Sequence, residues 1–229
     1  MNQVSVELAA QMDETNTTRL MILMGISAIS VIFYLFADSK KIAKGRVLGK
    51  MTAASCFIIL ALLMDASQST FGQIMMAAFF FCWVGDLFLL SREQKWFLSG
   101  LVSFLIGHLA FTFAFYQRGI ETKAILFPTL CVIFSGLLIG YWLLPKVSKE
   151  MKVPVLVYMI AIITMVVCAF GTHHHTSNGT IPLAALVFMV SDIYVARDQF
   201  VHQSFTNRLI GAPLYFGAQM AFATTVSVA

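Results

Sequence analysis

The chain has 229 residues, of which 59% are hydrophobic and only 11% carry a charge. Soluble domains are about 25% charged, and a mean hydropathy of +0.84 lies far from that class. These values exclude an ordinary cytosolic enzyme, a disordered chain and a nucleic-acid-binding protein, and they predict an integral membrane protein.

The apolar residues form continuous runs rather than an alternating pattern, which predicts α-helices and excludes a β-barrel. A bilayer core of about 30 Å needs about 20 residues of helix to cross it. The connections between the runs are too short to build a soluble domain. We therefore predict an all-α integral membrane protein, with eight transmembrane helices in one bundle that forms a single domain over residues 20–228. The predicted helices cover residues 20–37, 47–64, 71–90, 97–116, 124–144, 153–171, 180–196 and 209–228.

The first nineteen residues are polar and acidic and lack the basic start of a signal peptide. We therefore expect residues 1–19 to form a polar segment that is retained before the first membrane helix.

Lysine and arginine are distributed unevenly between the two predicted faces of the membrane. Eleven of the 15 lie in the loops after the odd-numbered helices, whereas Arg19, Arg118 and Lys123 lie on the face that holds both termini. Cytoplasmic loops carry the basic excess, so both termini are predicted to be non-cytoplasmic. This distribution explains the net positive charge without a nucleic-acid partner. The lack of a recognisable targeting peptide and the compact loops lead us to expect a bacterial inner membrane.

Three predicted helices each contain one charged residue, although such a residue costs about 2.5–3.5 kcal/mol inside a membrane. They are Lys50, Asp86 and Asp192. At 1.5 Å per residue all three lie roughly 5–6 Å inside the cytoplasmic edge of the membrane core. Their common depth predicts a shared functional site. The alternative is that Lys50 extends to the lipid headgroups and that the aspartates only cap helix ends.

Uncharged polar residues lie in the predicted helices at mid-membrane or nearer the cytoplasmic side. Taken singly, each is more often a partner in a hydrogen bond between helices than a catalytic group. Together they outline a polar cavity that opens toward the cytoplasmic leaflet. The residues are His108 at mid-membrane, Tyr141 near a helix end, Tyr158, Ser191 and Tyr194 beside Asp192, and the pair Tyr215 and Gln219 on one helix face.

The four cysteines lie inside apolar runs, with no Cys-x-x-Cys pair and no histidine at ligand spacing. We expect buried thiols and neither a disulfide framework nor a metal site.

The order and spacing of six short motifs resemble the lysoplasmalogenase (YhhN) family of membrane hydrolases. The resemblance runs from the second predicted helix to the last. It departs from the family pattern at Met51, Ala184 and Phe216 without removing an ionisable group. The motifs are Lys50, Gly85-Asp86 with LFLL, GHLAFTFAF around His108, VPVLVY ending at Tyr158, ALVFMVSD ending at Ser191-Asp192, and LYFGAQ from Leu214 to Gln219.

The resemblance implies hydrolysis of the vinyl ether bond of lysoplasmalogens, which are single-chain phospholipids with an ethanolamine or choline headgroup. The products are a fatty aldehyde and glycerophosphoethanolamine or glycerophosphocholine. It also implies that Asp86 and Asp192 carry the reaction without a metal or an organic cofactor. The implied partners are a lysophospholipid substrate and the bilayer. The sequence makes no prediction of an oligomeric state.

The chemistry of a vinyl ether suits the same residues. Protonation of its β-carbon gives an oxocarbenium ion, which water captures, so one carboxyl must be protonated and another ionised, as in glycosidases. Asp86 and Asp192 are the predicted pair, in either order. Lys50 is predicted to hold one aspartate ionised or to meet the substrate phosphate. The predicted substrate-binding residues are Lys50, His108, Tyr158, Ser191, Tyr215 and Gln219.

A proton-coupled transporter of a small molecule or lipid is the main alternative, because buried carboxylates and lysines also form proton relays. The two halves of the sequence show no evident repeat, and no helix is interrupted as in many carriers. We therefore place the transporter second.

Overall fold

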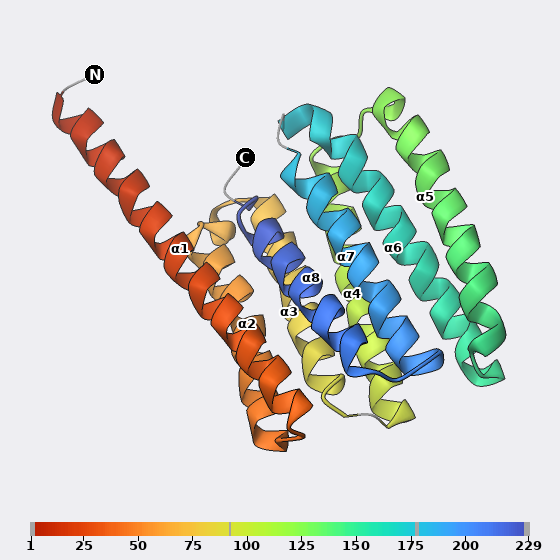
Figure 1. The fold of residues 1–229 in the computed structure, drawn as a ribbon. Coiled ribbons are helices and arrows are strands. Elements are labelled where there is room, and N and C mark those ends of the chain that lie inside the picture. Colours follow the sequence, from red (N-terminus) through yellow and green to blue (C-terminus); the bar gives the residue numbers. More distant parts are fainter. Residues whose placement is uncertain (1–2, 92, 177–178, 227–229) are drawn as a thin grey trace.

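The computed structural model describes residues 3–91, 93–176 and 179–226, with side-chain detail for all of these except 3–16, 124 and 173–176. Within these ranges the chain forms eight α-helices and two single-turn 3-10 helices, with no strand (Figure 1). The all-α prediction is therefore confirmed. The α-helices are α1 (Gln3–Ser39), α2 (Ala43–Leu63), α3 (Thr70–Phe88), α4 (Gln94–Gln117), α5 (Thr122–Leu143), α6 (Lys149–Thr176), α7 (Thr180–Phe200) and α8 (Phe205–Ala223).

Each predicted apolar run overlaps one of these helices, but the helices extend beyond the runs. Helix α1 begins at Gln3, so most of the polar segment predicted over residues 1–19 continues the first membrane helix. Helix propagation depends on backbone hydrogen bonds, so a helix does not end where its apolar residues end. The non-cytoplasmic location of that segment and the single domain over residues 20–228 stay predictions.

Seven of the helices are long and apolar enough to cross a membrane, and α8 is not among them. Helix α8 has 19 residues, and Asn207, Arg208 and Gln219 lower its hydropathy. It nevertheless lies alongside the other helices and packs against α1, α2 and α7 (Figure 1). The structure is therefore that of a helical membrane protein, whereas the count of eight spans stays a prediction.

Helices that follow each other in the chain pack as antiparallel pairs, notably α1 with α2, α3 with α4 and α7 with α8. Because α8 returns to lie between α7 and the α1–α2 pair, residues from both ends of the chain meet inside the bundle (Figure 1). Helix α5 lies at one edge, where its main contacts are with α6 and α7.

Glycines permit two close helix contacts near the charged residues. A Cβ atom at Gly49 would lie 2.7 Å from the backbone nitrogen of Tyr34, so the glycine lets α1 approach the start of α2. A Cβ atom at Gly85 would lie 2.6 Å from the Phe104 ring, which packs over α3 next to Asp86. Both contacts hold neighbouring helices close to the level of Lys50 and Asp86.

Buried aromatic rings fill the half of the bundle that lies away from the charged residues. Phe79 packs against Phe57 and Phe111 with ring centroids 5.5 Å apart in both cases. Phe111 also stacks on Phe222 at 4.8 Å. All four rings are fully buried, so this half is a close-packed core.

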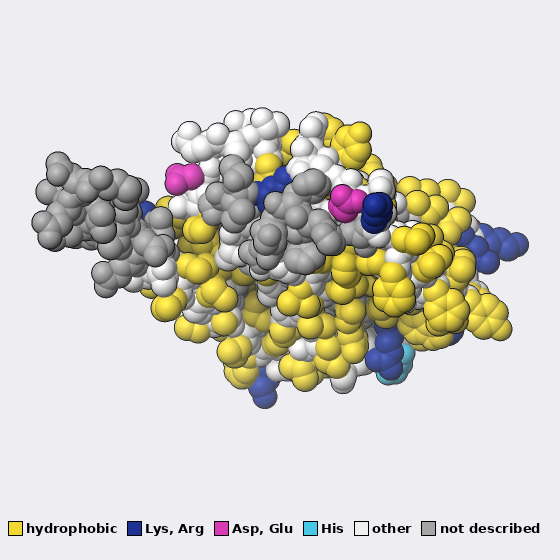
Figure 2. All heavy atoms as spheres, turned by 90° about the horizontal axis from the view of Figure 1, so that it is seen from above, with side chains coloured by type: hydrophobic (Ala, Val, Ile, Leu, Met, Phe, Trp, Pro, Cys, Tyr) yellow, Lys and Arg dark blue, Asp and Glu magenta, His cyan; other side chains and the backbone are white. Residues whose placement is uncertain are grey.

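The two ends of the bundle differ in charge. The end that carries the α1–α2, α3–α4, α5–α6 and α7–α8 connections, at the bottom of Figure 1, holds most of the lysines and arginines. Figure 2 looks onto the opposite end, where charged side chains are few and scattered among hydrophobic ones. The difference matches the uneven loop charges in the sequence, and we call the first of these the basic end.

Candidate functional site

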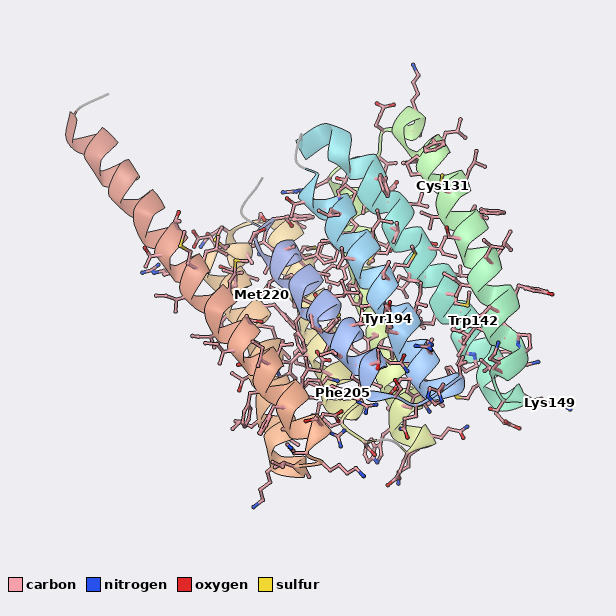
Figure 3. All side chains as sticks on the ribbon, in the orientation of Figure 1. Cys131, Trp142, Lys149, Tyr194, Phe205 and Met220 are labelled. Carbon is pink, nitrogen blue, oxygen red and sulfur yellow. The ribbon has the colours of Figure 1, made fainter. Side chains whose placement is uncertain are left out.

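A cavity of about 210 Å³ opens within the bundle toward its basic end, and all eight helices contribute to its lining. Oxygen and nitrogen atoms gather there, between the lower ends of α7 and α8 and near the labelled Tyr194 (Figure 3). Lys50, Asp86 and Asp192 all line this cavity, as do Tyr158 and Tyr215. The structure thus brings the three charged residues of the membrane helices to one place.

Asp86 is buried and is surrounded by donors. Its Oδ1 lies 3.2 Å from the Nζ of Lys50, which also donates to the Asp86 carbonyl oxygen at 3.2 Å. The hydroxyl of Tyr215 donates to Asp86 Oδ2 at 2.6 Å, and Gln219 Nε2 donates to that hydroxyl at 3.2 Å. An ion pair and a hydrogen bond on separate oxygens favour the ionised carboxylate here.

Asp192 lies among different neighbours. The Tyr158 hydroxyl donates to Asp192 Oδ2 at 2.6 Å, and His108 Nε2 lies 3.8 Å from the same oxygen. No lysine or arginine of the described chain forms an ion pair with Asp192. Its side chain is 18% exposed, against 2% for Asp86, so Asp192 is the more accessible of the two.

The hydrogen bond of His108 indicates which of its ring nitrogens carries a hydrogen atom. Nδ1 lies 2.7 Å from the carbonyl oxygen of Phe104, which only accepts, so Nδ1 carries a hydrogen. In the neutral ring Nε2 then presents a lone pair. That atom is buried and has no hydrogen-bond partner among the described residues. Asp192 Oδ2 lies 3.8 Å from this nitrogen, and a lone pair in place of a cation beside it favours the neutral Asp192 carboxyl over the ionised one.

Phe188 lies between the aromatic neighbours of the two carboxyl groups. Its ring packs against His108 at 4.8 Å and against Tyr215 at 5.3 Å, measured between ring centroids. Asp86 and Asp192 both line the cavity. The rings of His108, Phe188 and Tyr215 therefore form an aromatic wall between the neighbours of the two aspartates.

Not every polar residue predicted for the cavity lines it. Ser191 is buried and donates to the carbonyl oxygen of Phe188 at 2.7 Å, within its own helix. Tyr141 is 86% exposed on the outer side of α5 instead of facing inward. Because α5 is apolar on nearly all sides, its sequence does not show which face is internal. His108 and Gln219 contact the site through Asp192 and Tyr215 rather than as cavity-lining residues.

The structure also reveals a charged network that the sequence analysis missed, at the mouth of the cavity. Asp38, with a side chain only 1% exposed, lies 3.0 Å from Arg46 Nε and 2.6 Å from Arg208 Nε. Arg208 Nη1 in turn lies 2.7 Å from Asp198 Oδ2. The only sequence signal was Asp38 itself, which follows the end of the first predicted helix by one residue.

The cysteines are free thiols that differ in exposure. Cys56 and Cys82 are buried free thiols, Cys168 is half-buried, and Cys131 lies on the exposed side of α5. Cys131 therefore departs from the expectation that the thiols are buried. Within the described residues, no three His, Cys, Asp or Glu side chains are grouped so that they could hold a metal ion.

Comparison with known proteins identifies relatives over most of the chain. The family model described as the YhhN family matches residues 45–226. A bovine (Bos taurus) protein named lysoplasmalogenase TMEM86A is 30% identical over 149 residues, which are 61% of this chain and 59% of that protein. The chain thus aligns with less than two thirds of the bovine protein's length. No solved structure matches.

Proposed function

The chain belongs to the YhhN family, and from that premise we propose that it is a lysoplasmalogenase. It hydrolyses the vinyl ether bond of lysoplasmenylethanolamine or lysoplasmenylcholine. Two observations support this proposal: the bovine relative is named a lysoplasmalogenase, and two aspartates with contrasting partners line one cavity in a membrane protein. The second observation carries the proposal, because vinyl ether hydrolysis needs one protonated and one ionised group.

Asp192 acts as the general acid in this proposal. The lone pair of His108 beside it, and the lack of a lysine or arginine partner among the described residues, suit a carboxyl that holds a proton. Asp192 transfers this proton to the β-carbon of the vinyl ether. The electron pair of the double bond forms the new C–H bond, and the ether oxygen shares its lone pair to give an oxocarbenium ion.

Asp86 acts as the base. Lys50 and Tyr215 keep it ionised while the cation forms beside it. It removes a proton from the water that attacks the oxocarbenium carbon, which gives a hemiacetal. The hemiacetal then collapses: its hydroxyl proton passes to the ionised Asp192, the C–O bond to glycerol breaks, and the glycerol oxygen takes the proton that Asp86 removed from water. The products are a fatty aldehyde and the glycerophospho-base, and each carboxyl returns to its starting state.

The apolar part of the cavity provides a place for the alkenyl chain. It is lined between α5 and α6 by Gly136, Ile139, Met159 and Ile163. Gly136 lets the Ile163 side chain approach α5 closely, because a Cβ atom at Gly136 would clash with Ile163 Cδ1. A single-chain lipid therefore reaches the aspartates with its chain held among aliphatic side chains.

The orientation in the membrane belongs to the same proposal. The basic end holds most lysines and arginines, which supports a cytoplasmic location for this end and for the cavity mouth. With α8 as an eighth span, both termini lie outside the cytoplasm, in a bacterial inner membrane. A reporter that is active only in the periplasm, fused to the C-terminus, tests this location. Reporter activity is expected, and its absence would contradict the proposed orientation.

Aldehyde release from purified protein in detergent tests the activity. The substrate is alkenyl-lysophosphoethanolamine, with and without EDTA, and the saturated alkyl-ether lipid is the control. Aldehyde from the vinyl ether alone, unchanged by EDTA, is the expected result. No aldehyde from folded protein would contradict the hydrolase and favour the proton-coupled carrier.

A further inference from the structure

Two arginines at the cavity mouth are held in place from behind by one buried carboxylate. Asp38, at the end of α1, forms ion pairs with Arg46 in the first turn of α2 and with Arg208 in the first turn of α8. Both arginines line the cavity, whereas Asp38 does not. Because each pair uses the Nε atom, the edge of each guanidinium group that is formed by its two terminal nitrogens does not face Asp38.

Within the described part of the chain, one terminal nitrogen of each arginine forms no hydrogen bond. Arg46 Nη2 donates to the Leu90 carbonyl oxygen at 3.3 Å, and Arg208 Nη1 lies 2.7 Å from Asp198 Oδ2. Neither Arg46 Nη1 nor Arg208 Nη2 donates a hydrogen bond to a described residue. Two donors from two helices therefore remain for a ligand. A phosphodiester, with two unbridged oxygens, matches that arrangement.

The position of these donors fits a substrate that reacts at Asp86. Arg46 and Lys50 are four residues apart, so they lie on the same face of α2. At 1.5 Å per residue they are separated by about 6 Å along the helix axis. This separation is comparable to the length of the glycerol backbone, which links the phosphate of a lysophospholipid to its ether oxygen. A phosphate at Arg46 therefore places the ether oxygen close to the level of Lys50 and Asp86.

We propose that Arg46 and Arg208 form the headgroup site of the cavity and bind the phosphate of a zwitterionic lysophospholipid, with Asp38 as the positioning residue for both. The inference rests on the proposed function and names how its substrate is held. Lys50, whose amino group is taken by Asp86, then serves the reacting centre rather than the phosphate.

The balance of charge at the mouth favours a zwitterion. Arg46 and Arg208 face Asp38 and Asp198, so the four side chains carry no net charge. Asp198 also lines the cavity and has a side chain that is 20% exposed. An ethanolamine or choline headgroup adds one negative and one positive group, so the phosphate meets the arginines while the ammonium lies near Asp198, whose oxygens also accept from Ser204, Asn207 and Arg208. Binding leaves no uncompensated charge at this depth.

Kinetics on two substrates test the headgroup site. One is alkenyl-lysophosphoethanolamine, and the other is 1-alkenylglycerol, which has the same vinyl ether and no phosphate. For Arg46→Gln and Arg208→Gln we expect KM for the phospholipid to rise roughly 10-fold to 100-fold, which is the effect of losing a charge-assisted hydrogen bond. KM for the alkenylglycerol and kcat for both substrates should stay close to the wild-type values.

Lys44→Gln is the matched control, because Lys44 is an exposed cation two residues from Arg46 that does not line the cavity. It should leave the KM ratio of the two substrates unchanged. If a glutamine variant does not purify as folded protein, Arg46→Lys and Arg208→Lys provide the comparison, with a smaller rise for the phospholipid alone. Equal changes for both substrates in folded variants would overturn the proposal.

Binding separates this inference from the proposed activity. Saturated 1-alkyl-lysophosphoethanolamine, which has no vinyl ether, should stabilise the wild-type protein against heat more than 1-alkylglycerol does, and the arginine variants should lose that difference. If no substrate yields aldehyde but this difference persists, the activity fails and the headgroup site stands. If aldehyde forms while both lipids stabilise the wild type equally, the headgroup site fails alone.

Discussion

The surroundings of Asp86 and Asp192 differ although the two residues line one cavity. Asp86 is buried, paired with Lys50 and hydrogen-bonded to Tyr215. Asp192 is partly exposed and has as neighbours the Tyr158 hydroxyl and an unpartnered nitrogen of His108. The proposed mechanism gives these identical side chains opposite proton transfers, because among the described residues the neighbouring helices supply a cation to only one of them.

Removing either carboxyl should have the largest effect. We expect Asp192→Asn and Asp86→Asn each to lower kcat by about 10³-fold or more, since general acid–base groups contribute roughly 10²–10⁴-fold. Aldehyde release under saturating substrate measures this change. Asp65→Asn is the control, because Asp65 is exposed and its left-handed backbone, with φ of 59°, suits asparagine. Near-wild-type turnover in either variant would refute the paired mechanism.

Replacing Lys50 should disturb the ion pair with Asp86 and leave the surroundings of Asp192 unchanged. Lys50→Met leaves Asp86 as a buried charge without its cation, and breaking such a pair costs about 3–5 kcal/mol. We expect a fall in kcat of about 10²-fold and a lower thermal stability in detergent. The double variant Lys50→Met/Asp86→Asn should regain part of that stability while remaining inactive. A double variant less stable than Lys50→Met would show that the pair does not act as a unit.

The two tyrosines provide a finer comparison of the two sides. Tyr158→Phe and Tyr215→Phe each remove one hydroxyl that donates to an aspartate at 2.6 Å. Loss of a hydrogen bond to a charged or reacting group should lower kcat about 10-fold. Tyr116→Phe is the control, because Tyr116 is 65% exposed. If both site variants behave like Tyr116→Phe, the tyrosines have no part in proton transfer.

The smallest effect is expected from a substitution in the apolar wall of the cavity, away from both aspartates. Ile163→Phe adds volume to the apolar wall opposite Gly136. We expect kcat/KM for a long alkenyl chain to fall about five-fold relative to a short one, because overpacking an apolar site costs about 1 kcal/mol at the low end. Leu183→Phe, on an exposed position of α7, should leave the ratio unchanged. An unchanged ratio in Ile163→Phe would place the chain elsewhere.

The sequence predicted the class of fold and the two aspartates because charges inside membrane helices are rare and costly. It could not separate the roles of Asp86 and Asp192, since their partners Tyr215 and Tyr158 come from distant helices. It also missed the network of Asp38, because basic residues in loops are equally typical of membrane orientation. The outward direction of Tyr141 was hidden for a related reason: a helix that is apolar on all sides gives no indication of its internal face.

Hydrolysis in D₂O tests the central claim, that a carboxyl of the protein protonates the vinyl ether carbon, most directly. The aldehyde is trapped by borohydride as it forms and analysed by mass spectrometry. We predict one deuterium on the carbon next to the former aldehyde carbon, and a rate in Asp192→Asn that is lowered about 10³-fold. Aldehyde without that deuterium, or an Asp192→Asn variant as fast as the wild type, would contradict the mechanism.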